Sequence, residues 1–318
     1  MSPPLSGPLP RYVHEAVYFD TGQQLVDATA PLLREALAHG DDVALACAEG
    51  NNEALIQALG GDERVRVLPR AEIYSQAVSA VTYLRDLLEE HCDAGAGQRL
   101  CILGEVGFGT DARALEQWRR YEALLDYALS PFPLWLLCGY NTRVLPDQVL
   151  VTAELTHPFL RRDGRQAANP THVDPAELLR LVDADDALVP QVEPALTIEE
   201  VLDFGDLRRE LETLLLAEGI TRDRIEDVIM AVHEVATNGV RHGQPPVTAR
   251  VWLSPGRVVC TVTDRGAGFD DPFAGYLRGA GEDLPEGRFG LWLARQLCHE
   301  LTTSRTPEGF TARLVIHH

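Results

Sequence analysis

The stretch HEVATNGVRHG at residues 233–243, followed by DRGAG at residues 264–268, decides the fold of the C-terminal part of this chain. Apolar residues in and before the first stretch recur with a period of about 3.6 residues, which predicts an amphipathic helix over residues 224–242. The apolar side of that helix should pack on a sheet. Glu234 and Asn238 lie together on the other side, because residues four apart are neighbours on a helix surface.

The polar side of this helix carries groups that suit a magnesium nucleotide. The Glu234 carboxylate can accept a proton from a water or a hydroxyl, and the Asn238 carboxamide offers the hard oxygen ligand that magnesium prefers. Arg241 and His242 follow one turn later, where they can meet phosphate charge. The same spacing also occurs on ordinary solvated helix faces, but an asparagine followed by Gly239 inside a helix is unfavourable and needs a reason.

A β-hairpin is predicted between the two motifs. Its strands are VTARVWL at residues 247–253 and VVCTVT at residues 258–263, with a Ser-Pro-Gly turn between them. Asp264 ends the second strand, where its carboxylate can accept a hydrogen bond from the exocyclic amine of adenine. Gly266 and Gly268 let the backbone turn and let a flat ring approach closely. Because D-x-G-x-G is also a common turn sequence, this motif is informative only together with the first one.

The segment after the second motif predicts a lid over phosphates. Residues 270–287 are rich in Gly, Asp and Pro, and so long a loop in a compact domain is usually functional or disordered. The loop leads into a short helix over residues 289–297, and the amides at a helix N-terminus bind phosphate. The candidate phosphate contacts are Gly287, Arg288, Gly290 and Leu291.

Together these residues resemble the ATPase family shared by gyrase, histidine kinases, a heat-shock chaperone and a mismatch-repair ATPase. Within that family they most resemble the anti-sigma-factor serine kinases of bacteria. The resemblance covers about residues 197–318 and extends to GLWLARQLC at residues 290–298 and EGFTARL at residues 308–314. It implies an α/β two-layer sandwich with ATP and magnesium as cofactors.

The resemblance also implies roles for single residues. Asn238 would hold magnesium and Glu234 would polarise the attacking group, while Asp264 would meet the adenine amine with support from Thr311. One departure concerns the lid, where the family has Gly-x-Gly just before the helix. Arg288 occupies the position of the first of those glycines, which puts tight triphosphate binding and turnover in question.

Two other functions therefore stay open for this half of the chain. A module that sequesters a protein partner without turnover would be compatible with Arg288. A histidine kinase would need a phosphorylatable histidine on a helical dimerisation domain just upstream, and the sequence supplies none. His233 lies on the nucleotide helix itself and is expected to have a local structural role.

The N-terminal half alternates apolar runs with helical patterns. This alternation is typical of a doubly wound, mostly parallel sheet, whose ligands bind beyond the carboxyl ends of the strands. No phosphate-loop motif occurs, and no Gly-x-Gly-x-x-Gly follows a strand. Strands are expected at residues 16–19, 43–48, 65–68, 100–103 and 134–138, and helices at residues 25–38, 52–59, 74–91 and 113–129.

Scattered residues of this half resemble the sensory domain of methylotroph and methanogen regulators, a relative of recombinase-type ATPases that lacks the phosphate loop. The resemblance implies that this half senses a signal or docks a partner. Each candidate has a hydrogen-bonded structural role as its alternative, which is favoured for His14 and His157, whereas Glu105 ends a strand where a ligand would bind. The candidates are His14, Glu105, Glu122, Cys138, Tyr140 and His157.

The composition excludes several classes of protein. Acidic residues outnumber basic ones 48 to 28, and the formal charge of −20 argues against direct binding of nucleic acid. The chain has no apolar run that would span a bilayer and no signal-peptide pattern, so a cytoplasmic protein without membrane contact is expected. The six cysteines lack C-x-x-C spacing and are expected to be small buried hydrophobes, not disulfides or metal ligands.

The length of 318 residues permits two domains. We expect a sensory domain at residues 1–185, an acidic, proline-bearing linker at 186–196 and an ATP-binding serine kinase domain at 197–318. The whole would be a signal-responsive regulator that phosphorylates or sequesters a protein partner, either an anti-anti-sigma factor or a sigma factor. Many relatives of the C-terminal domain dimerise, so a homodimer is an alternative that the sequence leaves open.

Overall fold

The structure is a computed structural model that describes residues 11–74, 77–93, 98–107, 112–186, 190, 192–201, 203–277 and 288–318. The chain divides into two compact units, Met1–Leu178 and Leu179–His318. The division falls inside helix α7 (Pro175–Asp186). Each unit is described by itself below.

The N-terminal unit is built on one sheet of order β3-β2-β4-β5-β1-β6-β7. Every neighbouring pair is parallel except β6 and β7, which form an antiparallel hairpin at one edge. The expected doubly wound, mostly parallel fold is therefore confirmed. The strands are β1 (Tyr12–Phe19), β2 (Asp42–Ala46), β3 (Val65–Val67), β4 (Leu100–Glu105), β5 (Leu134–Asn141), β6 (Phe159–Arg162) and β7 (Arg165–Ala168).

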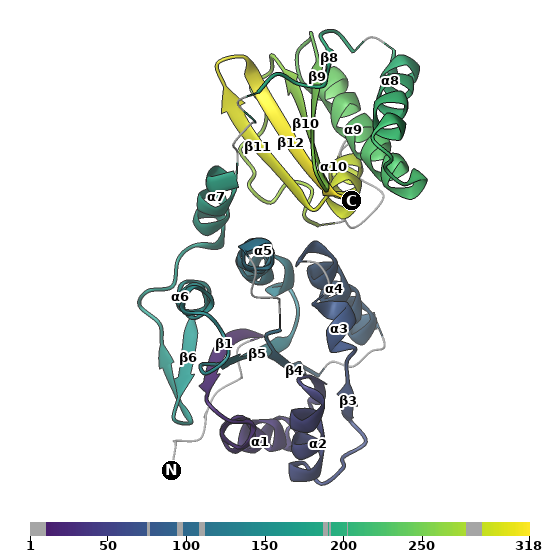
Figure 1. Cartoon of the computed structure of the whole chain (residues 1–318). Helices are drawn as coiled ribbons and strands as arrows, with labels where there is room; N and C mark the ends of the chain where they lie inside the picture. The colour runs from purple at the N-terminus through teal and green to yellow at the C-terminus, as the bar shows by residue number, and fades with distance from the viewer. Residues whose placement is uncertain are drawn as a thin grey trace. The chain divides into compact units, whose positions relative to one another are not determined.

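Helices cover both faces of this sheet, with α1 and α2 on one face and α4, α5 and α6 on the other (Figure 1). The first helix starts at a capping box, in which the Thr21 hydroxyl accepts from the Gln24 amide and the Gln24 side chain accepts from the Thr21 amide. The central strands β4 and β5 are buried along almost their whole length, as strands covered on both faces must be. The helices are α1 (Gly22–Ala38), α2 (Glu49–Ala58), α3 (Arg70–Ile73), α4 (Ala77–Asp93), α5 (Ala112–Leu129) and α6 (Asp147–Thr156).

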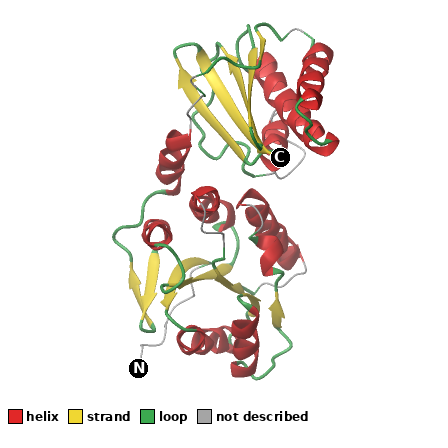
Figure 2. Cartoon of the chain, viewed as in Figure 1, coloured by secondary structure: helices red, strands yellow, loops and turns green. Residues whose placement is uncertain are grey.

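The C-terminal unit is a two-layer sandwich, as expected. Its antiparallel sheet has the order β11-β12-β10-β9-β8, and its helices lie on one face of that sheet (Figure 2). The strands are β8 (Leu196–Ile198), β9 (Thr248–Ser254), β10 (Arg257–Asp264), β11 (Glu300–Thr306) and β12 (Gly309–His317), and the helices are α8 (Phe204–Ala217), α9 (Arg222–His242) and α10 (Arg288–Leu297).

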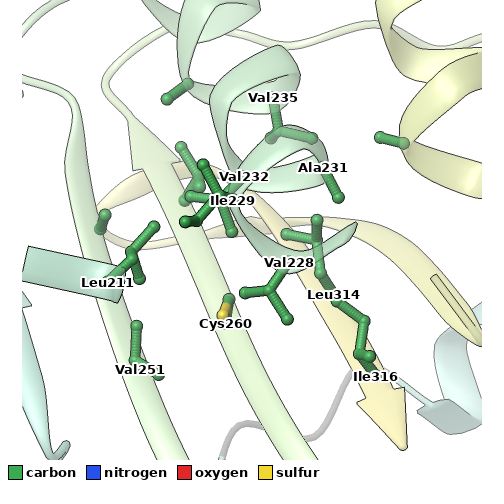
Figure 3. Close-up of a cluster of buried hydrophobic side chains, with 14 of the residues drawn as sticks. Leu211, Val228, Ile229, Ala231, Val232, Val235, Val251, Cys260, Leu314 and Ile316 are labelled. Atoms are coloured by element: carbon green, nitrogen blue, oxygen red, sulfur yellow. The ribbon is translucent and has the colours of Figure 1, made fainter. Parts of the chain in front are cut away.

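Helix α9 is held on the sheet by its apolar stripe. Figure 3 shows Val228 and Val232 of α9 in one cluster with Cys260 of β10 and Leu314 of β12. Fully burying one such aliphatic side chain stabilises the fold by about 1.5–3 kcal/mol. The stripe predicted from the 3.6-residue period is buried in full, namely Ile225, Val228, Ile229, Val232, Ala236 and Gly239. The helix ends at His242 with Gly243 as its C-cap, and Pro245 and Pro246 follow shortly after.

Among the helices of the described residues, none combines the length and the apolar composition that a membrane crossing requires.

Candidate functional site

A cavity of about 280 Å³ opens in the C-terminal unit beside the last turns of α9. Its walls come from α9, the end of β10, the start of α10 and the strands β11 and β12. The volume is close to the lower end of the range for small-molecule pockets. The two sequence motifs contribute to the same walls, since Asn238 lies on one side and Asp264 on another.

Helix α9 presents Asn238 and His242 to this cavity. They lie four residues apart, so they share one helix face. Glu234 is half-buried one turn earlier, on the same side, and next to the start of α10. Arg241 is exposed and is not part of the cavity wall. The structure thus brings Asn238 and His242 to the cavity, with Glu234 adjacent, and leaves Arg241 outside.

Asp264 is fixed by backbone amides at the bottom of the cavity. Its Oδ1 accepts hydrogen bonds from the Gly266 amide at 2.6 Å and from the Gln244 amide at 3.2 Å. In the described part of the chain Oδ2 has no hydrogen-bond partner, which leaves that oxygen for a ligand. The neighbouring glycine is required, because a Cβ on Gly243 would lie 2.4 Å from the Asp264 carboxyl group.

Gly268 has a φ of +65°, a conformation that side chains other than glycine rarely adopt. A Cβ there would stand 2.0 Å from the Phe310 ring. Phe269 packs against the same ring at a centroid distance of 5.0 Å. The predicted glycine turn therefore leaves space for the Phe310 ring, which forms an aromatic wall beside Asp264.

Helix α10 supplies the remaining wall. Leu291 lines the cavity, and Gly290 is buried against α9. A Cβ on Gly290 would lie 2.4 Å from Glu234 Oε2, so the Glu234 carboxylate packs directly against this glycine. Arg288 is the first residue of α10, and Gly287 lies outside the described residues.

Thr311 does not line the cavity, contrary to the role that the resemblance implies. Side chains alternate along a strand, and Phe310 and Ala312 take the two positions that face the cavity. The Thr311 hydroxyl instead lies 2.9 Å from the hydroxyl of Thr263, its partner on β10. The hydroxyl on the cavity wall belongs to Thr303 of β11, which is paired with Ala312.

Sequence reasoning missed Thr303 and the aromatic pair Phe269 and Phe310. No motif marks Thr303, because its place on the wall follows from the register between β11 and β12. Phe269 directly follows the DRGAG motif, so its position next to the turn was a usable signal.

Glu105, a candidate in the N-terminal unit, is engaged within the fold. Its Oε2 accepts hydrogen bonds from the Ala48 amide and from Asn51 Nδ2, both at 2.8 Å. These contacts join the end of β4 to the start of α2. The carboxylate thus anchors a helix N-terminus, a position that suits negative charge.

The other five sensory candidates meet in one buried cluster beneath α5 and α6. The Cys138 sulfur lies 3.4 Å from His14 Nε2, and the rings of His14 and His157 are 4.0 Å apart between centroids. The Tyr140 hydroxyl donates to Glu122 Oε1 at 2.7 Å. All five side chains are at most 4% exposed. Residues from both ends of the unit thus converge on one point.

Burial dominates the electrostatics of this cluster. It raises the pKa of Glu122 to about 7, although the nearby His14 acts in the opposite direction. Burial also lowers the pKa of His157 well below its usual value. For His14, burial acts to lower the pKa, but the adjoining Asp126 carboxylate outweighs it and the pKa is raised. The cluster therefore places His14 beside the Asp126 carboxylate, among groups whose charged forms burial disfavours.

Comparison with known proteins gives a family for each half. Residues 13–158 match the model of the MEDS domain, the methanogen/methylotroph DcmR sensory domain, and residues 201–316 match that of the histidine kinase-like ATPase domain. The chain therefore combines a MEDS domain with a histidine kinase-like ATPase domain. No curated protein matches the chain.

Part of this chain is similar to a solved structure, the RsbU and RsbW domains of Rv1364c from Mycobacterium tuberculosis. The sequence identity is 23% and the TM-score is 0.29. The matched region covers 38% of this chain and 31% of that chain, so the chain spans less than a third of that structure's length.

Proposed function

We propose that the C-terminal domain binds ATP with magnesium and transfers the terminal phosphate to a serine of a protein partner, under the control of the N-terminal domain. The observation that carries the proposal is the single cavity to which Asn238 and Asp264 both contribute, from motifs that are 26 residues apart. The match of residues 201–316 to the histidine kinase-like ATPase domain supports a nucleotide as the ligand.

The cavity residues fit the adenine end of such a nucleotide. Asp264 Oδ2 is an acceptor for the exocyclic amine, and the rings of Phe269 and Phe310 give an apolar wall for a purine. Thr303 adds a hydroxyl on the strand side of the cavity. Guanine carries a carbonyl where adenine carries the amine, so a carboxylate at this place favours adenine.

The phosphate end would lie toward α9. Asn238 has the amide oxygen to ligate a magnesium ion, and His242 lines the same wall. When bound, magnesium neutralises the charge that develops on the phosphates. The chain's own contribution is to fix these groups on one rigid helix.

Glu234 is our candidate for activating the serine hydroxyl. Its carboxylate would take the hydroxyl proton while the serine oxygen forms its bond to the terminal phosphorus of ATP and the bond from that phosphorus to the oxygen of the departing ADP breaks. It lies one turn before Asn238, adjacent to the cavity but outside its wall.

The partner class follows from charge and from the domain pair. A chain with a formal charge of −20 is poorly suited to bind nucleic acid directly, so a regulatory output would act through a protein. We propose an anti-anti-sigma factor or a sigma factor as that partner. We also propose domain limits at residues 1–185 and 197–318, with residues 186–196 as the linker.

A second candidate function rests on Arg288. The position holds glycine in the resembling kinases, and an arginine there favours a domain that sequesters its partner with weak nucleotide binding or none. Calorimetric titration of the full chain with ATP and magnesium separates the two functions. An absence of heat at millimolar ATP would favour the sequestering module.

Two substitutions and a control test the kinase proposal. We expect Asn238→Ala to abolish binding of ATP with magnesium, and Glu234→Ala to keep binding but lose transfer to the partner. Glu226→Ala, on the exposed side of α9, is the matched control and should change neither property. The partner is first captured from the native host with and without ATP, and acid-stable phosphate is then measured on it.

Normal transfer by both site variants would overturn the assignment. Acid-labile phosphate on the chain itself would instead support a histidine kinase.

A further inference from the structure

The buried cluster of the N-terminal domain has the side chains of a transition-metal site. His14 comes from β1, Cys138 from β5 and His157 from the residue that follows α6. Strands β1 and β5 are neighbours, with Ala16 opposite Cys138, so His14 and Cys138 lie diagonally on one face of the sheet. The fold therefore brings together a thiol and two imidazoles that are far apart in the sequence.

The distances between these groups fit a tetrahedral ion. The three potential ligand atoms, two imidazole nitrogens and the Cys138 sulfur, all lie within 4.8 Å of one another. A tetrahedral ion with ordinary zinc bond lengths holds a nitrogen and a sulfur ligand about 3.6 Å apart. His14 Nε2 and Cys138 Sγ are already 3.4 Å apart.

In each of the two histidines, the ring nitrogen that would not bind the ion has an oxygen atom as its neighbour. Metal-bound histidines have the same arrangement. His14 Nδ1 lies 2.9 Å from Asp126 Oδ1, and His157 Nδ1 lies 2.8 Å from the carbonyl oxygen of Ala153. A carbonyl can only accept, so His157 carries its proton on Nδ1 and has a lone pair on Nε2. A carboxylate or carbonyl on the far nitrogen is the usual support for a metal-binding imidazole.

His157 Nε2 has no hydrogen-bond partner within the part of the chain that the structure describes, although the side chain is fully buried. The carboxylate oxygen Oε2 of Glu122 is 3.8 Å away, which is beyond hydrogen-bonding distance. A buried polar atom without a partner is rare and requires an explanation, such as an ion. A plain hydrogen bond from the Cys138 thiol to His14 would leave this nitrogen unexplained.

We propose that His14, Cys138 and His157 bind a divalent transition-metal ion, with zinc the best fit. A thiolate with two imidazoles suits zinc or cobalt, and it does not suit magnesium or calcium, which prefer oxygen ligands. The site is closed, because every one of its ligand residues is at most 4% exposed. The ion would therefore be acquired as the domain folds and would be held within its core.

This proposal revises the sequence-based expectation for Cys138, which treated all six cysteines as plain hydrophobes. Spacing along the chain gave no signal, because the ligands are 124 and 19 residues apart in sequence. The proposal is also independent of the nucleotide site, which belongs to the other unit.

The test uses the untagged full chain, produced in minimal medium with added Co²⁺ and purified without chelator. Metal content is measured by mass spectrometry of the elements, and the absorption spectrum reports the ligands. We expect about one cobalt per chain, visible bands of tetrahedral intensity and a near-ultraviolet thiolate-to-cobalt band. Growth with Zn²⁺ should give about one zinc per chain in the same measurement.

Two variants and a matched control identify the ligands. Cys138→Ala should lose the thiolate band and the stoichiometric metal, and His157→Ala should lose the metal. Cys101→Ala removes an equally buried thiol from the adjoining strand β4, away from the cluster, and should keep both signals. Circular dichroism shows which variants are folded.

The wild-type spectrum decides the case even if a variant does not fold. A wild-type chain without stoichiometric metal, or with cobalt that shows no thiolate band, overturns the proposal. So does a folded Cys138→Ala variant that retains both signals.

Discussion

Glu234 Oε2 occupies the space where a side chain on Gly290 would begin, since a Cβ at residue 290 would stand 2.4 Å from that oxygen. The contact joins α9 to the third residue of α10. A carboxylate beside a helix N-terminus is favoured by the helix dipole. The absence of a side chain at Gly290 thus lets the proposed catalytic carboxylate pack directly on the start of α10.

We expect Gly290→Ala to impair phosphotransfer while leaving the fold intact. The added methyl group forces the Glu234 carboxylate or α10 to move, and a displacement of about 1 Å near a reacting group can cost about 100-fold in rate. Alanine has a higher helix propensity than glycine by up to about 1 kcal/mol. This gain offsets the cost of the displacement, so the free energy of unfolding should change little. Transfer rates and thermal unfolding of the full chain check this.

Gly50→Ala in α2 is the matched control, because its Cβ would meet nothing within 4 Å. It should leave transfer unchanged. Equal activity of the Gly290→Ala variant and the wild type would contradict the proposed role of this contact.

The elements with strong periodicity were predictable from the sequence. The helix expected over residues 224–242 is observed as Arg222–His242, because its apolar stripe continues over several turns. The parallel sheet of the N-terminal domain was likewise indicated by strand-helix alternation. The hairpin of β6 and β7 was not predicted, since those strands are short and partly exposed and have no apolar run.

The candidate site was predictable only as far as its motifs extend. Asn238 and Asp264 lie on the cavity because their motifs fix both the residue and its local backbone. The structure places Thr311 off the cavity wall and next to Thr263, a position that depends on strand pairing. The place of Thr303 on the cavity wall depends on a second pairing, that of β11 with β12. Local sequence does not encode the register of either pair of strands.

The Asp264 carboxylate should determine recognition of adenine. Asp264→Asn keeps one oxygen for the backbone amides of Gly266 and Gln244 but sets an amine against the amine of the base. Loss of a hydrogen bond to a charged group costs about 1.5–3 kcal/mol, so ATP affinity should fall about 10- to 150-fold. Calorimetry measures this, and Asp270→Asn, on the exposed loop nearby, should bind ATP normally.

Substitutions at two glycines with similar φ angles distinguish the effect of backbone strain from the effect of a steric clash. Gly268 has φ +65° and faces the Phe310 ring, whereas Gly256 has φ +70° in the β9–β10 turn, with its nearest neighbour 3.6 Å away. Alanine at either position should cost about 1–2 kcal/mol of folding free energy from the left-handed backbone alone. Only Gly268→Ala should also displace the ring and weaken ATP binding. Equal ATP affinity in the two variants would refute an aromatic wall at the ligand.

The two threonines of the final hairpin should behave differently when each is changed to valine. Thr303→Val removes a hydroxyl from the cavity wall and should weaken ATP binding about fivefold, the equivalent of about 1 kcal/mol. Thr311→Val removes the hydrogen bond to Thr263 and should lower the free energy of unfolding by about 1 kcal/mol, with ATP affinity unchanged. Calorimetry and urea unfolding of both variants check this. The reverse pattern would restore Thr311 to the cavity.

The thiols provide a test of the packing of both domains. Cys92 is half-buried and the other five cysteines are buried, with no disulfide among them. Burial raises the pKa of Cys101 and of Cys260 to about 12, so at pH 8 about one thiol in 10,000 is ionised at each. The thiolate is the reactive form, and a buried sulfur is also shielded from the reagent.

We therefore expect one thiol per chain to react quickly with an aromatic disulfide reagent at pH 8, and all six to react in denaturant. At pH 9 still only about one thiol in 1,000 is ionised at Cys101 and at Cys260, because their pKa values are about 12, so the slow group should remain slow. Cys92→Ser is the control and should abolish the fast phase. A fast phase that persists in this variant would mean that at least one of the two cores opens to solvent in the native protein.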